Sequence, residues 1–156
     1  MKSLFLLPVL LLPCVLMSAQ TADAAPKFED YRVTEQYSGK NAQPVLDTKD
    51  KREFHTRLRE AARDKVNFAG HYVFTAWGCG GGCLVGAVID ARTGQVYLLP
   101  FTLCCWPVEV EKPIDYRVDS RLVVFTGSRN EQGQGVYYYK FGDNRFTLLK
   151  AVEKKQ

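Results

Sequence analysis

The sequence predicts one small α+β domain, in which an N-terminal amphipathic helix packs on a meandering antiparallel sheet of about six to seven strands, stapled by disulfides. Three observations predict this fold: one stretch of helical periodicity within residues 48–65, a succession of short β-type runs after Gly70, and four cysteines gathered within residues 79–105. A chain of this length suits a single domain with one modest core.

The N-terminus has the three parts of an export signal. Lys2 is followed by a leucine-rich apolar run over residues 3–17 and by small and polar residues that end at Ala24. The apolar run is shorter than the ~20 residues that span a bilayer. We therefore expect a signal peptide at 1–24, cleavage after Ala24, and a single α+β domain at 25–156 that is periplasmic or secreted.

Two other interpretations of this segment are weaker. An uncleaved anchor would need a longer apolar run, and a lipoprotein would need a small residue before Cys14, where the sequence has Leu12 and Pro13. The net charge of +4 is mild and has no long run of like charges, which argues against a nucleic-acid partner. We also expect no stable membrane insertion after cleavage.

The first part of the domain carries the helical pattern. Residues 26–41 are polar and dotted with aromatic side chains, which indicates an extended lead-in and a candidate edge strand. Asp47 is a favourable N-cap. The apolar residues that follow share one helix face and predict a helix over residues 48–65: Phe54, Leu58, Ala61, Ala62 and Val66. The opposite, basic face is interpreted as solvated surface.

After Gly70 the pattern changes to β-type runs. Strands are expected at residues 71–77, 83–90, 95–103, 107–111, 122–125, 136–141 and 146–152. Turns are expected at 90–94 and 142–144, and a polar loop at 128–135.

The four cysteines that follow the signal predict two disulfides in an oxidising compartment. A hairpin that pairs Ile89 with Val96 places Cys83 opposite Thr102 and diagonal to Cys104. The favoured connectivity is therefore Cys83–Cys104 with Cys79–Cys105, and a one-residue change of register would swap the partners. Cys79–Cys83 with Cys104–Cys105 is the least favoured, because bridging adjacent cysteines strains the backbone.

Thiol or metal chemistry at this cluster is the alternative. Four cysteines can hold zinc, but the usual pairs separated by two residues are absent. A redox site normally uses Cys-x-x-Cys at a helix start, whereas Cys79 and Cys83 are separated by three residues and lie between expected strands. We expect no metal and no cofactor.

The glycines between Cys79 and Cys83 predict a binding loop. Gly80-Gly81-Gly82 precedes a strand and lacks the Lys-Ser/Thr of a phosphate loop, so its value is conformational. We assign the loop to Trp77, Gly78, Gly80, Gly81, Gly82 and Trp106, with the two tryptophans either capping the disulfides in the core or serving as aromatic anchors at an interface.

Catalytic groups do not form a recognisable set. His55 and His71 have the surroundings of ordinary structural histidines, and no serine lies in Gly-x-Ser-x-Gly. We therefore expect a non-catalytic protein.

Several motifs carry a resemblance to known proteins. Asn67-Phe68-Ala69-Gly70-His71-Tyr72, Trp77-Gly78-Cys79-Gly80 and Gly127-Ser128-Arg129-Asn130 resemble a group of small exported bacterial proteins. The resemblance implies export and a shared fold, and it implies no activity.

A weaker similarity in layout is to the periplasmic inhibitors of vertebrate-type lysozyme. Those α+β domains present a short disulfide-bounded loop that plugs the target's cleft. Their loop carries polar and charged groups, including a histidine, whereas Gly80-Gly81-Gly82 offers only backbone.

The sharper hypothesis is thus a binding module for a protein partner in the cell envelope, either an inhibitor of a cell-wall hydrolase or an immunity protein against one. The alternatives are a periplasmic enzyme with thiol or metal chemistry at the cysteines and an envelope structural protein.

Overall fold

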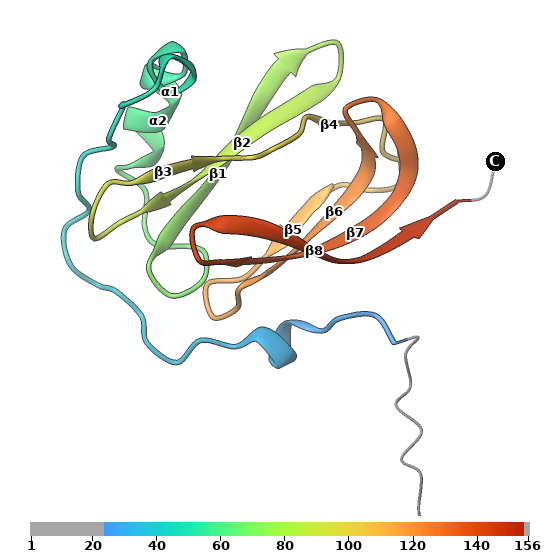
Figure 1. Ribbon diagram of the computed structural model, residues 1–156, viewed down its shortest axis with the longest axis horizontal. Helices are drawn as coiled ribbons and strands as arrows, with labels where there is room; N and C mark the ends of the chain where they lie inside the picture. The colour runs from blue at the N-terminus through green and yellow to red at the C-terminus, as the bar shows by residue number, and fades with distance from the viewer. Residues whose placement is uncertain (1–23, 155–156) are drawn as a thin grey trace, which may run out of the picture.

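An antiparallel sheet of eight strands, with two short helices against one part of it, forms the fold (Figure 1). The computed structural model describes residues 24–154. The predicted signal peptide, residues 1–24, lies outside the described residues except for Ala24, and Cys14 lies outside them as well. The elements are a 3-10 helix at Phe28–Tyr31, α1 at Lys49–Glu53, α2 at His55–Ala61, β1 at Tyr72–Gly80, β2 at Cys83–Asp90, β3 at Val96–Leu98, β4 at Leu103–Cys104, β5 at Ile114–Tyr116, β6 at Leu122–Arg129, β7 at Gln132–Gly142 and β8 at Arg145–Glu153.

The sheet has two parts that β4 joins. The strand order is β1-β2-β4-β6-β7-β8, with β3 beside β2 and β5 beside β6. The short strand β4 pairs with β2 through Leu84 and Leu103, and with β6 through Leu103–Arg129 and Cys104–Ser128. We call β1–β3 the helix-side part and β5–β8 the C-terminal part.

Two apolar clusters lie on opposite faces of β1 and β2. Side chains alternate along a strand, so Phe74 and Val88 join the aromatic cluster between the two parts of the sheet, while Val73 and Ile89 face the helices. The aromatic cluster includes Phe125 and Tyr137, which are fully buried. The helix-side part is therefore covered on both faces.

The predicted single helix is two short helices. Phe54 interrupts it with φ −92° and ψ 17°. Thr48, and not Asp47, is the N-cap, because its hydroxyl accepts a hydrogen bond from the N–H of Lys51 while the Asp47 carboxylate pairs with the Lys51 ammonium at 2.7 Å. The predicted apolar stripe is confirmed at Leu58, Ala61 and Ala62, which are buried.

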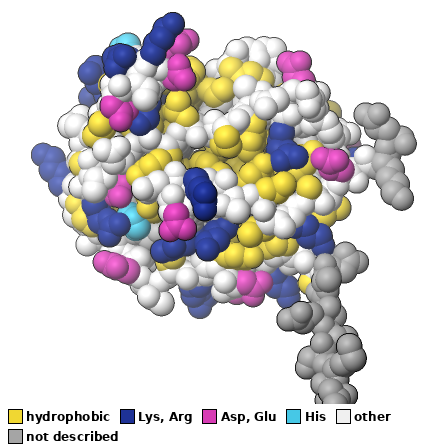
Figure 2. Space-filling model, viewed as in Figure 1, with side chains coloured by type: hydrophobic (Ala, Val, Ile, Leu, Met, Phe, Trp, Pro, Cys, Tyr) yellow, Lys and Arg dark blue, Asp and Glu magenta, His cyan; other side chains and the backbone are white. Residues whose placement is uncertain are grey.

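The outer surface of the helices carries both signs of charge. Figure 2 shows basic and acidic side chains interspersed where Figure 1 places α1 and α2. Arg57 and Glu60, one helical turn apart, approach to 3.6 Å, and both side chains are more than half exposed. Such a surface is typical of a solvated helix face.

Most predicted strands are confirmed, and β2 has the predicted bounds, residues 83–90. The hairpin turn after Gly142 is also confirmed, with Asp143 and Asn144 at φ 50° and 62°, as a two-residue hairpin turn requires.

Four predictions of strands and loops are wrong. The predicted strand at residues 95–103 is interrupted, because β3 ends at Leu98 and β4 begins at Leu103. Residues 107–111 form a turn closed by the Val110 N–H and the Pro107 carbonyl, since β5, which begins at Ile114, takes the available edge of β6. Residues 128–135 are not a loop, because β6 and β7 continue to a tight turn at Asn130–Glu131. The described residues of the lead-in form the 3-10 helix and an isolated bridge between Arg32 and Ser120, but no edge strand.

Candidate functional site

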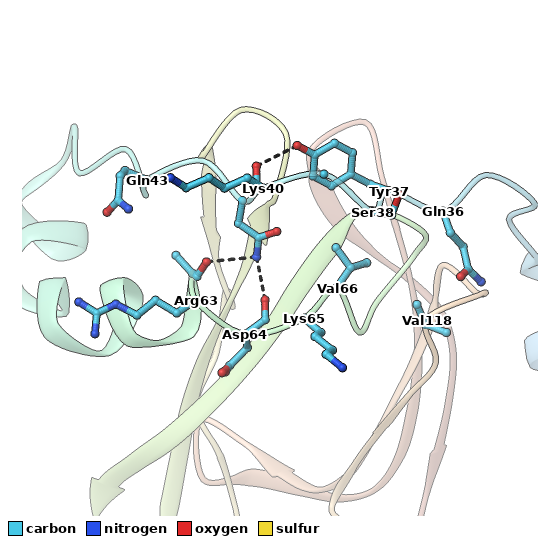
Figure 3. Close-up of a pocket in the computed structure, with 13 residues that line it drawn as sticks. Gln36, Tyr37, Ser38, Lys40, Gln43, Arg63, Asp64, Lys65, Val66 and Val118 are labelled. Carbon is cyan, nitrogen blue, oxygen red and sulfur yellow. Dashed lines mark hydrogen bonds between the residues drawn. The ribbon is translucent and has the colours of Figure 1, made fainter.

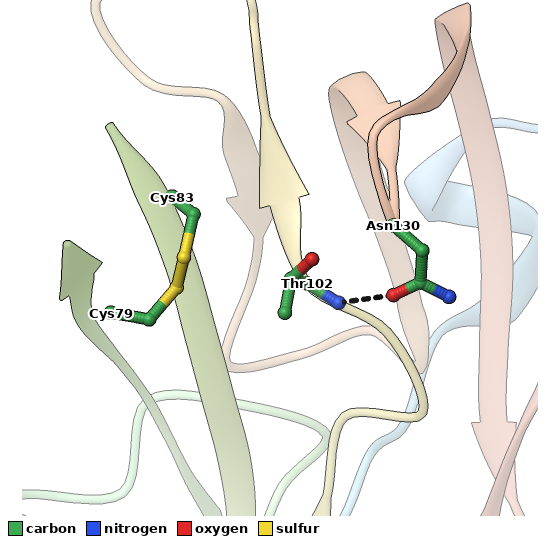
Figure 4. Close-up of a disulfide and its surroundings, with 4 residues drawn as sticks. All are labelled: Cys79, Cys83, Thr102 and Asn130. Atoms are coloured by element: carbon green, nitrogen blue, oxygen red, sulfur yellow. Dashed lines mark hydrogen bonds between the residues drawn. A yellow bond between two sulfur atoms is a disulfide. The ribbon is translucent and has the colours of Figure 1, made fainter. Parts of the chain in front are cut away.

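The cysteines lie at one end of the sheet, where three tips meet. The first is the β1–β2 tip with Cys79 and Cys83, the second is β4 with Cys104, and the third is the β6–β7 turn. Thr102 and Asn130 join the last two, since the Thr102 N–H donates to the Asn130 side-chain oxygen and the Asn130 N–H donates to the Thr102 carbonyl, each at 2.9 Å. Figure 4 shows this pair beside the disulfide. We call this region the cysteine end.

The disulfide joins Cys79 to Cys83, so the predicted bonds Cys83–Cys104 and Cys79–Cys105 are wrong. The tight turn through the glycines brings the Cα atoms of Cys79 and Cys83 to 5.3 Å, within the range that a disulfide spans. Cys104 and Cys105 are outside any disulfide.

The register that supported the prediction holds only in part. Ile89 pairs with Val96 as predicted, but further along β2 the partner of Leu84 is Leu103. The segment between β3 and β4 thus contains two more residues than a regular ladder would need, and Thr102 is not the residue opposite Cys83.

The loop that the disulfide closes is open to solvent. Gly80, Gly81 and Gly82 have φ angles of 92°, 57° and 77°, which favour glycine, and a Cβ atom on any of them would meet nothing within 4 Å. All three are exposed. The loop therefore presents backbone groups with no side chain over them.

The two tryptophans do not form a pair beside the loop. Trp77 packs on Phe54, with ring centroids 5.1 Å apart, in the cluster that faces the helices. Trp106 packs against the aromatic cluster on the other side of the helix-side part. Gly78 pairs with Leu84 within the β1–β2 ladder. Of the predicted loop residues, only Gly80, Gly81 and Gly82 form its open tip.

The two thiols of Cys104 and Cys105 differ in exposure. Cys104 is buried, with 4% of its surface accessible, while Cys105 is exposed. The hydrogen bond between the two side chains, followed by burial, raises the pKa of Cys104 to about 11. Cys105 has φ 58°, and its carbonyl accepts a hydrogen bond from the Gln134 amide at 2.9 Å.

A network around Arg129, which the sequence interpretation missed, locks the neighbouring β6–β7 hairpin. The guanidinium lies 3.8 Å from the centroid of the Tyr137 ring and donates to the Tyr139 hydroxyl at 2.6 Å. The Tyr137 hydroxyl donates to the Glu153 carboxylate at 3.1 Å. Burial, followed by this bond to Glu153, raises the pKa of Tyr137. An open cavity of about 540 Å³ borders Arg129, Tyr139 and Glu153.

His71 lies far from the cysteines. It precedes β1, whereas Cys79 is near the other end of that strand, about 26 Å away at the rise of an extended chain. Its ring is 2.6 Å from an Arg92 nitrogen and 3.9 Å from the Asp90 carboxylate. Burial, and then the charge of Arg92, lowers the pKa of His71. His71 and the cysteine thiols are therefore not placed to act together.

A larger cavity, of about 630 Å³, lies between residues 36–43 and the end of α2 (Figure 3). The Asn41 amide donates to the carbonyls of Ala62 and Asp64, at 3.1 and 2.7 Å. The first bond satisfies the carbonyl of the residue that caps α2, and the second holds the segment just after the helix. The cavity thus follows from the way the lead-in covers the helix end.

Residues 24–154 contain no group of three or more His, Cys, Asp or Glu side chains placed to share a metal ion. None of the helices in this range is long and apolar enough to cross a bilayer.

Comparison of the chain with protein-family models, with curated proteins and with solved structures finds no match.

Proposed function

We propose that the chain is an exported, non-catalytic module that binds a protein partner in the cell envelope through the loop closed by Cys79–Cys83. The observation that carries the proposal is the loop itself, three exposed glycines held between two disulfide-bonded residues at the tip of a hairpin. The sharper form of the proposal is that the partner is a cell-wall hydrolase, which the module inhibits or to which it confers immunity.

The closed loop reduces the cost of binding. Three consecutive glycines without the disulfide would be highly flexible, and a partner would have to order them. With a disulfide across five residues and a paired strand on each side, much of that ordering precedes the encounter. A protein partner can then be recognised by backbone N–H and carbonyl groups that no side chain covers.

The shape of the tip favours a protein partner over a small molecule. Small ligands bind in concave sites with buried walls. Gly80, Gly81 and Gly82 are exposed and have open space where their side chains would be. A narrow, convex tip of this kind fits into a cleft on another protein, which is the role that the similarity in layout to lysozyme inhibitors implies.

The test is binding of the domain to a panel of periplasmic cell-wall hydrolases, measured together with inhibition of each enzyme. Gly81→Trp is expected to weaken binding at least about tenfold, which corresponds to about 1.4 kcal/mol. Asp143→Trp is the matched control, because Asp143 has φ 50° at another exposed hairpin tip, and it is expected to bind as the wild type does.

The panel also has outcomes that contradict the proposal. If the wild type binds none of the hydrolases, the hydrolase hypothesis is wrong. Equal losses in Gly81→Trp and Asp143→Trp would show that the loop is not the contact. Co-fractionation with peptidoglycan that Gly81→Trp leaves unchanged would favour the envelope structural protein instead.

A further inference from the structure

Two cysteines at the cysteine end are not used by the disulfide that closes the glycine loop. Cys104 ends β4 and is buried, whereas Cys105 follows it at the surface. Their side chains are in hydrogen-bond contact. Cys104 is one of the buried core residues, whereas the exposed Cys105 thiol has no part in the packing described above.

We propose that Cys104 and Cys105 form a reversible dithiol–disulfide site that reacts with disulfide-bearing oxidants, independently of the Cys79–Cys83 bond and of what the glycine loop binds. Cys105 is the entering thiol because it is the exposed member of the pair. Cys104 is the resolving thiol because it is covered by protein and its sulfur already contacts that of Cys105.

The reaction balances with one disulfide reagent. The Cys105 thiolate attacks one sulfur of R–S–S–R, which forms a Cys105–S–S–R bond and expels one thiolate that takes up a proton. Cys104 loses its proton to solvent and attacks the Cys105 sulfur, which forms the Cys104–Cys105 bond and expels the second thiolate. Two electrons and two protons pass from the cysteine pair to the reagent, which leaves as two thiols.

The backbone at Cys105 supports a reversible bond. Cys105 adopts φ 58°, which residues with a side chain rarely occupy, and the Gln134 amide holds its carbonyl there. A disulfide between adjacent residues is strained, and strained or exposed disulfides are the easily reduced ones. A bond of this kind is better suited to reversible oxidation than to permanent stabilisation of the fold.

The alternative for the second bond is a rearrangement across the strands. Because Leu84 pairs with Leu103, the next residues along these strands, Cys83 and Cys104, end neighbouring strands. Exchange between them would produce the Cys83–Cys104 and Cys79–Cys105 bonds. In the structure, however, the Cys83 sulfur is bonded to Cys79, and the Cys104 sulfur contacts Cys105.

Peptide mapping separates these outcomes. Purified protein with two free thiols is treated with oxidised glutathione and digested with trypsin without reduction. Cleavage after Lys65, Arg92 and Arg117 places Cys79 and Cys83 in peptide 66–92, and Cys104 and Cys105 in peptide 93–117, because the Lys112-Pro113 bond resists trypsin. The proposal expects two separate peptides, each lighter by two hydrogen atoms than its reduced form. Peptides linked to each other, a persistent glutathione adduct, or disulfide-linked dimers would each overturn it.

Two single variants test the order of the steps. Cys104→Ser is expected to stop at one glutathione on Cys105, and Cys105→Ser to react at least about tenfold more slowly, because the remaining thiol is buried. Equal reactivity of the two variants would contradict the assigned roles. Phenylarsine oxide gives a readout that needs no variant: with the Cys79–Cys83 bond intact, it is expected to bind the wild type one to one and to block Cys104 and Cys105 from alkylation. If alkylation of both thiols continues, the two sulfurs do not act as a pair.

Discussion

The β1–β2 and β6–β7 hairpins end side by side at the cysteine end, but they are held in different ways. The β1–β2 tip is closed by the Cys79–Cys83 bond. Its three glycines have open space where a Cβ atom would lie. The β6–β7 hairpin turns through Asn130 and Glu131 and is held by the side chains around Arg129.

The comparison shows that the β1–β2 tip is free to contact a partner, whereas the side chains near the β6–β7 tip are used to stabilise the fold. The disulfide leaves the backbone of the glycine tip uncovered, whereas β6–β7 is stabilised by Arg129 stacked on the buried ring of Tyr137. The first hairpin should therefore respond to reductants and the second to substitutions and to alkaline pH. The predictions below test this contrast.

The largest expected effect is that of Arg129→Ala. It removes the stacking on Tyr137 and the hydrogen bond to Tyr139, whose side chain is only 6% exposed. We expect the free energy of unfolding to fall by about 3 kcal/mol, measured by urea denaturation. Arg129→Lys, which keeps the charge but not the planar stack, is expected to lose less. A loss below about 0.5 kcal/mol for Arg129→Ala would show that the network does not stabilise the hairpin.

Removal of the disulfide by Cys79→Ser with Cys83→Ser should have a smaller effect. Closing so short a loop restricts the unfolded chain by about 2 kcal/mol in the chain-entropy treatment, and that amount is the expected loss of stability. Amide hydrogen exchange should accelerate at the β1–β2 tip and stay unchanged in β7. Equal acceleration in both hairpins would show that the two tips are not independent.

Alkaline pH should act on the β6–β7 side. Burial and the bond to Glu153 raise the pKa of Tyr137 above its ordinary value of 10.0, so the folded chain keeps this proton after the unfolded chain has lost it. Stability from this group is complete below pH 10.0 and is lost as the pH rises through the higher folded value. Cys104, whose pKa rises from 9.0 to about 11, acts in the same direction between those values.

Denaturation at a series of pH values measures this effect. The slope of stability against pH should be shallower in Tyr137→Phe than in the wild type, and Cys104→Ala should remove the earlier part of the fall. Unchanged slopes in both variants would contradict the assignment.

The features that the sequence predicted correctly are those that depend on residues close together in the chain. The bounds of β2 and the pairing of Ile89 with Val96 follow from an apolar run and from the turn after Asp90, so both could be predicted. The predicted disulfides failed because they required a regular ladder as far as β4. Buried Phe101 and the Thr102–Asn130 bonds belong to the irregular segment where the extra residues lie, and no local pattern marks it.

The Arg129 network was missed because its members come from three strands. Arg129, Tyr137, Tyr139 and Glu153 belong to β6, β7 and β8, and they meet only after both hairpins pair. One signal was present: tyrosines two residues apart lie on one face of a strand, and an arginine precedes the turn that leads to that strand. This signal could have indicated a stacked arginine, although not the carboxylate that completes the network.

The smallest expected effect is the difference in stability between two glycine substitutions, one in each hairpin. Gly81 has φ 57° and open space around it, so Gly81→Ala should cost only the strain of that backbone conformation, about 1 kcal/mol. Gly133 has φ 65°, but a Cβ atom there would lie 2.8 Å from the Tyr137 hydroxyl and 3.1 Å from the Glu153 carboxylate. Gly133→Ala should therefore cost about 2 kcal/mol, because it adds displacement of the Tyr137–Glu153 bond to the same strain. Urea denaturation of both variants measures the difference, and equal losses would mean that the β6–β7 tip is as loosely packed as the glycine loop.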